Sequence, residues 1–195
     1  MRRPSISLEQ LVKIGSSLLN RKGLTEFALK DVAHEVGMRL PSLYNYIESR
    51  EHLLMLIAED TAKRFYQLLS TAAQEGDGTE KILQVAEAYL NFAWDYPGEY
   101  ELMQAPIFWC KSSAGPVFES IFELVRQLTG DWRLAPEVET HFYRSLRSYL
   151  HGYADIGRQQ GFRRPQALES SAQFGLDLLL AGWQDYLAKQ DSISR

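Results

Sequence analysis

The stretch LKDVAHEVGMRLPSLYNYIESREHLL, residues 29–54, contains two short helical patterns separated by Gly37. Apolar residues recur at helical spacing on both sides of this glycine: Val32, Ala33 and Val36 before it, and Leu40, Leu43 and Ile47 after it. Two short helices joined by a glycine-containing turn are typical of the helix-turn-helix motif, whose second helix enters the major groove of DNA. The stretch therefore predicts a DNA-binding motif with a recognition helix that begins near Leu40.

The second helical pattern divides into inward-facing and outward-facing side chains. Leu40, Leu43 and Ile47 are expected to face the neighbouring helices, and Pro41 suits the first helical turn, where its missing N–H has no helical partner. A tyrosine hydroxyl on a stiff side chain suits a phosphate contact, which sets the register on DNA, whereas base edges give specificity. The predicted DNA-binding residues are Arg39, Leu40, Pro41, Ser42, Tyr44, Asn45, Tyr46 and Arg50.

A different interpretation of the two tyrosines stays open at this point. Tyr44 and Tyr46 also fit a helical protein that binds no nucleic acid, in which both would be amphipathic packing residues. Paired helices with a glycine turn are common, so the pattern of helices alone does not separate these alternatives.

Helical spacing also precedes and follows this stretch. Ser7, with Gln10 three residues later, has the spacing of a capping box, and the apolar periodicity that follows ends near Gly23. Ser49 or Glu48 can cap a longer fourth helix that ends at the glycine-rich break after residue 75. The expected organisation is a helix-turn-helix domain over residues 1–50 and a second helical domain over residues 51–195.

The second domain is also expected to be helical throughout. Expected helices cover residues 79–96, 99–103, 117–128, 136–160 and 165–189, with a turn at Pro97 and Gly98 and an irregular segment over 104–116. No period-2 run is long enough for a convincing strand, and no internal repeat stands out. The predicted fold class is all-α.

The charge of the chain is unevenly distributed. The 195 residues have a formal net charge of −4, but residues 1–50 hold eight Lys and Arg against five Asp and Glu. Residues 51–195 hold 13 basic against 20 acidic residues. This pattern indicates a small basic head on an acidic body, in which the head is drawn to phosphates.

Cysteine content and hydropathy indicate a cytoplasmic protein. Cys110 is the single cysteine and cannot form an intramolecular disulfide, and the N-terminus MRRPSISLEQL lacks the apolar region of a secretory signal. No run of 18 apolar residues occurs, so we expect no membrane-spanning segment.

The quoted stretch resembles the DNA-binding domain of the TetR family of transcriptional regulators. The resemblance runs from Leu8 to Leu54 and includes the helix LKDVAHEVG, the core LYNYI and the opening of the next helix, Ser49-Arg50-Glu51-His52-Leu53. It implies a DNA operator as the partner of the first domain. It also implies a helical C-terminal domain that binds a small effector and forms a homodimer.

Two positions depart from the usual pattern of that family. Ala28 occupies a position where a Thr or Ser often caps the second helix, and a missing cap costs about 1 kcal/mol. Arg39 occupies the position of a small hydroxyl residue that caps the recognition helix. This second departure makes Arg39 a candidate for operator-specific contact, although a solvated or phosphate-bound arginine is equally compatible with the sequence.

The last two long helices carry residues suited to a dimer face. Small residues that allow close helix approach accompany apolar positions spaced by three and four. The predicted interface residues are Phe142, Leu146, Leu150, Tyr153, Phe174, Leu178 and Gly182, and the alternative for each is the intramolecular core. The segment YLHGYADIGRQQGF, residues 149–162, also resembles the His-Gly element of the TetR subset named for Trp-His-Gly, although the Trp is not evident.

Aromatic residues concentrate in the middle of the chain and suggest an apolar effector pocket. The predicted ligand-binding residues are Phe92, Tyr96, Tyr100, Met103, Gln104, Phe108, Trp109, Phe122, Tyr143 and His151, and an aromatic-rich core is the alternative. His151 and Asp155 have the spacing of a metal pair on one helix, but two ligands are too few, so no metal or other cofactor is assigned. Cys110 fits a buried apolar residue better than a redox sensor.

The sequence therefore predicts a DNA-binding regulator, released from a palindromic operator by a small apolar or aromatic effector. An activator, a DNA-bound structural factor, or an all-α carrier or enzyme are the alternatives. No Gly-x-Ser-x-Gly, P-loop or dinucleotide fingerprint is present, so we do not expect an enzyme.

Overall fold

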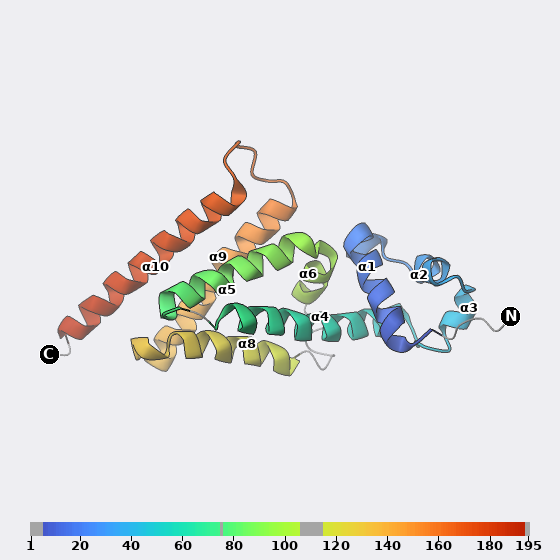
Figure 1. The fold of residues 1–195 in the computed structure, drawn as a ribbon, viewed down its shortest axis with the longest axis horizontal. Coiled ribbons are helices and arrows are strands. Elements are labelled where there is room, and N and C mark those ends of the chain that lie inside the picture. The colour runs from blue at the N-terminus through green and yellow to red at the C-terminus, as the bar shows by residue number, and fades with distance from the viewer. Residues whose placement is uncertain (1–5, 75, 106–114, 194–195) are drawn as a thin grey trace. The chain divides into compact units, whose positions relative to one another are not determined.

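A computed structural model describes residues 6–74, 76–105 and 115–193 of the chain. These residues form helices and connecting loops, and no strand occurs among them. The helices are shown in Figure 1 and are α1 (Leu8–Glu26), α2 (Leu29–Val36), α3 (Leu40–Leu43), α4 (Arg50–Ala72), α5 (Gly78–Asp95), α6 (Pro97–Gln104), α8 (Gly115–Leu128), a 3-10 turn (Gly130–Trp132), α9 (Pro136–Arg158) and α10 (Leu168–Ile193). The all-α prediction is confirmed.

The chain packs into two compact units. Unit 1 combines Met1–Tyr66 with Asp95–Glu119, and unit 2 combines Gln67–Trp94 with Ser120–Arg195. Unit 1 thus contains α6 as well as the helices of the quoted stretch. These units reflect packing, and the functional boundary expected at residue 50 stays a prediction.

Helix α1 begins as expected and ends later than expected. The Ser7 hydroxyl accepts a hydrogen bond from the Gln10 N–H, and the Gln10 side chain accepts one from the Ser7 N–H, which completes the capping box. Gly23, where the helix was expected to end, adopts φ 75° and produces a kink. The helical turns resume and run to Glu26, because glycine tolerates this backbone without ending the helical segment.

The turn of the helix-turn-helix depends on Gly37. Its φ of 72° and ψ of 29° lie in the left-handed region that glycine favours. The Gly37 N–H donates to the His34 carbonyl and the Met38 N–H donates to the Ala33 carbonyl, so the last carbonyls of α2 are satisfied. Helix α3 starts three residues later with Pro41 in its first turn and spans only Leu40–Leu43. The chain continues as a turn to Ile47.

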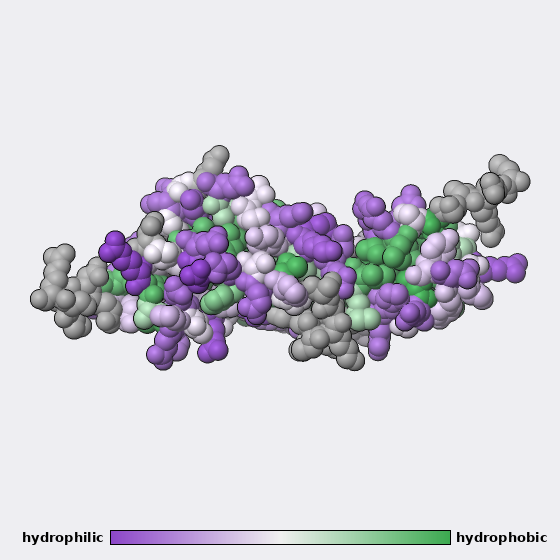
Figure 2. All heavy atoms as spheres, turned by 90° about the horizontal axis from the view of Figure 1, so that it is seen from below, coloured by the Kyte–Doolittle hydropathy of each residue, from purple (hydrophilic) through white to green (hydrophobic). Residues whose placement is uncertain are grey.

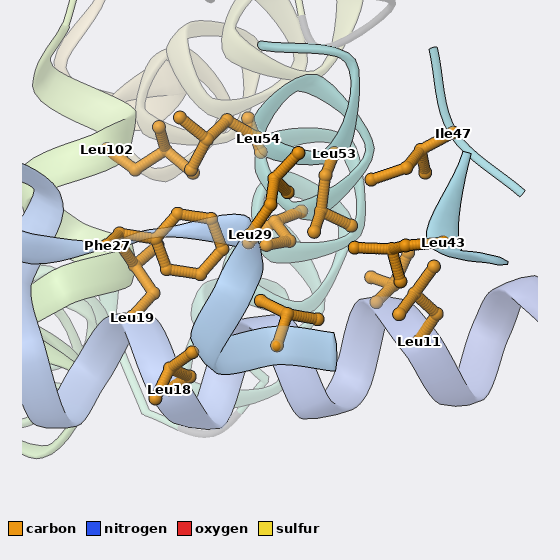
Figure 3. Close-up of a cluster of buried hydrophobic side chains, with 14 of the residues drawn as sticks. Leu11, Leu18, Leu19, Phe27, Leu29, Leu43, Ile47, Leu53, Leu54 and Leu102 are labelled. Carbon is orange, nitrogen blue, oxygen red and sulfur yellow. The ribbon is translucent and has the colours of Figure 1, made fainter. Parts of the chain in front are cut away.

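A single apolar cluster holds the helix-turn-helix together. Figure 3 shows side chains from α1, α2, α3, α4 and α6 converging on one another. The completely or almost completely buried members include Leu11, Leu18, Leu19, Phe27, Leu29, Leu43, Ile47, Leu53, Leu54 and Leu102. Leu43 and Ile47 therefore face inward as expected, and burial of each such side chain contributes about 1.5–3 kcal/mol.

Helix α6 approaches the backbone of α1 closely at Gly98. A Cβ built on Gly98 would overlap the Leu19 carbonyl and lie 2.8 Å from the Asn20 nitrogen. The Glu99 N–H, one residue later, donates to the Asn20 side-chain oxygen at 3.0 Å. Only glycine fits at residue 98 in this arrangement, so one residue sets how closely α6 and α1 can pack.

The carboxylate of Glu99 lies at the centre of a buried polar cluster in unit 1. Glu99 is 1% exposed, and its Oε1 accepts hydrogen bonds from Ser16 of α1 and from Thr61 and Arg64 of α4. Burial disfavours the charge of Arg64, but the hydrogen bonds and charges of Asp60 and Glu99 outweigh it, so its pKa is raised above the ordinary value. Arg64 stays charged, and Glu99 joins three helices.

Unit 2 packs α10 against α9 through aromatic side chains. Phe142 of α9 makes edge-to-face contacts with Trp132 at 5.2 Å and with Trp183 of α10 at 4.9 Å between ring centroids. The Tyr149 hydroxyl donates to the Ala172 carbonyl at 2.8 Å, and Gly175 leaves the space that the Tyr149 ring occupies. The aromatic contacts and the Tyr149 hydrogen bond hold the two helices together.

The surface is mixed in character. On the face drawn in Figure 2, hydrophilic side chains surround apolar patches, one of them at the α1–α3 end of the chain. Among the helices that the structure describes, none combines the length and apolar character that a membrane crossing requires.

The close approach at Gly98 leads to a first prediction. Gly98→Ala forces a methyl group into the α1 backbone, which cannot move aside, and should lower the free energy of unfolding by about 3 kcal/mol. Urea denaturation measures this change. The matched control is Gly130→Ala, because a Cβ at Gly130 meets nothing within 4 Å. If both variants unfold at the same urea concentration, the α1–α6 contact is not as tight as described.

The Glu99 cluster leads to a second prediction. Glu99→Ala leaves the Ser16 and Thr61 hydroxyls without their acceptor and removes one of the two carboxylates that pair with Arg64. We expect a loss of about 2–3 kcal/mol, at the low end for a broken buried pair because Arg64 is partly exposed. Glu9→Ala, which breaks the exposed pair with Lys13, should have little effect. Equal denaturation midpoints for the two variants would contradict the role of Glu99.

Candidate nucleic-acid interface and effector-binding region

The turn and helix after Gly37 present polar side chains to solvent. Arg39, Pro41 and Asn45 are exposed, and Tyr44 is 53% exposed although it follows directly on the buried Leu43. Arg39 is the residue before α3 and makes no side-chain capping bond, as its position in the sequence predicted. Local structure therefore exposes Arg39, Tyr44 and Asn45 to solvent while Leu43 packs in the core.

Arg39 has no acidic partner in the described part of the chain, in contrast to three other basic side chains of this region. Lys13, Arg21 and Lys22 pair with Glu9, Glu35 and Asp31, respectively. The hydrogen bond from Lys22 holds the pKa of Asp31 below its ordinary value, although partial desolvation opposes this. Within residues 6–74, 76–105 and 115–193, Arg39 makes no ion pair, so its guanidinium is available to an anionic partner or to a guanine edge.

The recognition segment, residues 39–46, comprises Arg39, α3 and the turn that follows, and some of its side chains border a hollow beside α1. Ser42 and Tyr46, which are half-buried, and Asn45 line this hollow of about 790 Å³ together with Gln10 and Lys13 of α1. Sequence reasoning did not include Gln10 and Lys13 in the predicted DNA-binding set. They lie 29 or more positions earlier in the chain, so only the packing of α1 against the motif brings them near Ser42.

Two members of the predicted DNA-binding set are placed differently from expectation. Leu40 was expected to face the neighbouring helices, but it is 37% exposed, because α3 begins there and only Leu43, one turn later, reaches the core. Arg50 is a structural residue: its Nε donates to the Phe27 carbonyl at 2.9 Å and its Nη2 to the Leu24 carbonyl at 2.6 Å. Its guanidinium joins the start of α4 to the α1–α2 loop, so Arg50 has a structural role in place of the predicted DNA contact.

The helix after the motif begins at one of its two expected caps. The Ser49 hydroxyl accepts a hydrogen bond from the His52 N–H at 3.0 Å, the N-cap arrangement. The Glu48 N–H donates to His52 Nδ1 at 3.0 Å, which closes the connection. Ser49, rather than Glu48, is therefore the cap of α4, and it fixes where α4 leaves the motif.

The predicted ligand-binding residues fall into both compact units. Four of them, Tyr96, Tyr100, Met103 and Gln104, belong to unit 1. Phe92, Phe122, Tyr143 and His151 belong to unit 2, where Phe122 and Tyr143 meet edge to face at 4.9 Å. Phe108 and Trp109, together with Cys110, lie outside the described residues. As the lining of one effector pocket, this set stays a prediction.

A hollow that the sequence did not predict lies within unit 2. It has a volume of about 330 Å³ and is formed by one stripe of α5 and one stripe of α10. Trp94 is its one aromatic lining residue, and Glu87 and Glu169 its acidic ones. Both stripes have the spacing of one helical face, but nothing in the sequence indicates that these two faces are opposite each other.

The predicted dimer residues separate into buried and exposed sets. On α9, Phe142, Leu146 and Leu150 are almost completely buried, because they pack inside unit 2, so their assignment to a dimer face is wrong. Tyr153 is half-buried, and its hydroxyl donates to the Leu168 carbonyl. On α10, Phe174 is 66% and Leu178 60% exposed, and Gly182 is exposed.

Comparison with known proteins identifies the family of the chain. The family described as "Tetracyclin repressor-like, C-terminal domain" matches residues 82–179, just over half of the chain. The "Uncharacterized HTH-type transcriptional regulator YobS" of Bacillus subtilis (strain 168) is 26% identical over 182 residues, which cover 92% of this chain and 94% of that protein. The more specific resemblance to the Trp-His-Gly subset stays a prediction.

Solved structures share the fold. A TetR protein from Acinetobacter baumannii AYE in complex with minocycline superimposes with a TM-score of 0.71 at 16% identity, covering 93% of this chain and 98% of that chain. BioQ with its double-stranded DNA operator gives a TM-score of 0.65 at 18% identity, covering 91% of this chain and 98% of that chain. With the helix-turn-helix around Gly37 and the helical second unit, these findings show that the chain belongs to the TetR family of DNA-binding transcriptional regulators.

Proposed function

We propose that this protein is a cytoplasmic, homodimeric repressor that binds a palindromic operator and leaves it when a small apolar or aromatic effector binds. The observation that carries the proposal is the set of outward side chains at the recognition segment: Arg39, Tyr44 and Asn45 are exposed around the buried Leu43. Support also comes from the two structural neighbours, one bound to its operator and the other to minocycline.

Each polar side chain of the recognition segment has a distinct role in this proposal. Tyr44 donates its hydroxyl to a phosphate and so helps to set the register of the protein on DNA. Arg39, Ser42 and Asn45 contact base edges in the major groove, where arginine can bind guanine through two hydrogen bonds. Lys13 lies on the α1 side of the adjoining hollow, and in this proposal it exchanges its exposed pair with Glu9 for a DNA phosphate.

The proposed dimer forms through the exposed stripe of α10. Phe174, Leu178, Ala181 and Gly182 follow one another at helical spacing and are all exposed. Large apolar side chains that remain exposed next to small residues mark an interaction surface. A two-fold dimer would place two recognition helices about 34 to 36 Å apart, or a multiple of that distance, to match successive turns of DNA.

In this proposal, release of the protein from its operator follows from thermodynamic linkage between effector binding and DNA binding. A ligand that binds one conformation of the dimer more tightly shifts the population toward that conformation. In the conformation that the effector favours, the two recognition helices no longer match two successive major grooves. The effector then lowers the affinity for the operator, and the operator lowers the affinity for the effector by the same factor.

A third prediction separates positioning from base reading. Tyr44→Phe should weaken binding to all operator variants by about 1 kcal/mol, because one phosphate hydrogen bond is lost. Arg39→Ala should instead lower the preference for one base at a symmetric pair of positions by about 1–3 kcal/mol. Fluorescence anisotropy at two salt concentrations, with single-base variants of an operator selected from random duplexes, measures both effects.

The control for this experiment is Lys63→Ala, which removes an exposed positive charge from α4 outside the recognition segment. A uniform loss of affinity and a shallower salt dependence for Arg39→Ala would make Arg39 a phosphate contact and not a base reader. If no duplex binds the unmodified protein more tightly than random DNA, the proposed operator function is wrong.

A fourth prediction concerns the dimer. Leu178→Asp places a charge in the exposed stripe of α10 and should convert the dimer to a monomer at micromolar concentration, as measured by sedimentation equilibrium. Leu68→Asp is the matched control, because Leu68 is an exposed leucine of α4 at 40%. An unmodified chain that sediments as a monomer, or a control variant that dissociates equally, would exclude this interface.

A further inference from the structure

The hollow between α5 and α10 has a buried apolar floor. Leu90 of α5 and Ala172 and Leu176 of α10 line it, and each of the three is at most 3% exposed. The indole of Trp94, one turn after Leu90, adds an aromatic surface at the same hollow. An apolar or aromatic group that entered the hollow would therefore exchange water for a hydrocarbon and indole lining.

The rim of the same hollow is acidic. Glu87 of α5 and Glu169 of α10 contribute carboxylates from the two sides, and both side chains are exposed. Neither carboxylate forms an ion pair within the part of the chain that the structure describes. No Lys or Arg is among the lining residues, so the two charges give the rim a negative potential with no internal counterion.

The uncharged lining residues give the hollow further binding capacity. Asn91 and Ser170 place an amide and a hydroxyl beside the carboxylates. Trp94 Nε1 is buried without a hydrogen-bond partner, and a Cβ at Gly157 of α9 would lie 3.0 Å from it. Cations bind above aromatic rings, and tryptophan provides the strongest such interaction among the side chains. The apolar floor, the indole and the two carboxylates of the rim thus favour the same kind of ligand.

We propose that this hollow is a binding site for a small organic cation that carries an apolar or aromatic body. The apolar body occupies the floor formed by Leu90, Ala172 and Leu176, and the positive charge lies between Glu87 and Glu169. The volume of the hollow, about 330 Å³, is at the small end of the range for ligand sites. The hollow can therefore hold one compact molecule.

A regulatory meaning for this site rests on the proposed function. Trp94 is near the C-terminal end of α5, five residues before Glu99, and the intervening chain contains Gly98. The contacts of Gly98 and Glu99 with α1 attach the following helix to the DNA-binding unit. A ligand bound at the end of α5 therefore lies next to the covalent connection to α6.

Isothermal titration calorimetry with tetraphenylphosphonium tests the site. Tetraphenylborate is the matched probe, because it has the same shape and apolar surface with the opposite charge. The unmodified protein should bind the cation at least about tenfold more tightly than the anion, and added salt should reduce the difference.

Variants of the rim locate the binding. Glu87→Gln and Glu169→Gln should each weaken tetraphenylphosphonium binding by about tenfold, because each removes one unpaired charge at the hollow. Glu119→Gln on α8 removes an equal charge from an exposed glutamate outside the hollow and should leave the affinity within about twofold. Thermal unfolding of each variant checks that the fold is retained, since Glu169 also lies in the first turn of α10.

Three results would overturn the proposal: no heat of binding with the cation, equal affinity for the cation and the anion, or unchanged cation binding in both rim variants. Operator binding is measured separately, without either probe, so that its failure rejects the proposed function and not the cation site. If operator binding is intact and tetraphenylphosphonium binds through Glu87 and Glu169 without changing operator affinity, the site stands and its regulatory link to α6 fails.

Discussion

The contact between Gly98 and the α1 backbone is the constraint on which the arrangement of unit 1 depends. Because no side chain fits at residue 98, α6 can approach α1 closely enough for Glu99 to reach Ser16, Thr61 and Arg64. A helix that is distant in sequence thereby becomes part of the unit that carries the recognition segment. The buried carboxylate then specifies one orientation, since its hydrogen bonds are directional and apolar contacts are not.

This constraint also limits how a ligand in unit 2 can influence DNA binding. The chain passes between the two compact units within α4 after Tyr66, within α5 after Trp94 and within α8 after Glu119. Helices transmit displacement along their axes better than loops do, because their backbone hydrogen bonds resist local deformation. A ligand beside Trp94 would therefore act on the last turn of α5, which Tyr96 connects to the helix α6 that carries Gly98 and Glu99.

The predictions that the structure corrected have a common physical origin. Arg50, Leu40 and the apolar stripe of α9 were assigned from residue type and spacing alone. The guanidinium N–H groups of arginine can donate to phosphates or to backbone carbonyls, and those of Arg50 donate to two carbonyls in the α1–α2 loop. An apolar stripe such as that of α9 fits a dimer face or a core, and the choice depends on which other helices cover it.

The sequence by itself determined the helical fold, the capping box at Ser7, the turn at Gly37 and the inward positions of Leu43 and Ile47. These features depend on local propensity and on a spacing of three to four residues, which neighbours along the chain are sufficient to specify. Only the tertiary structure decided the pairing of α6 with α1, the buried position of Glu99 and the hollow between α5 and α10. Each of these three features brings together segments that are separated by many residues in the chain. Which segments meet depends on the complementary shape and charge of whole helix faces, and a local sequence pattern does not specify this.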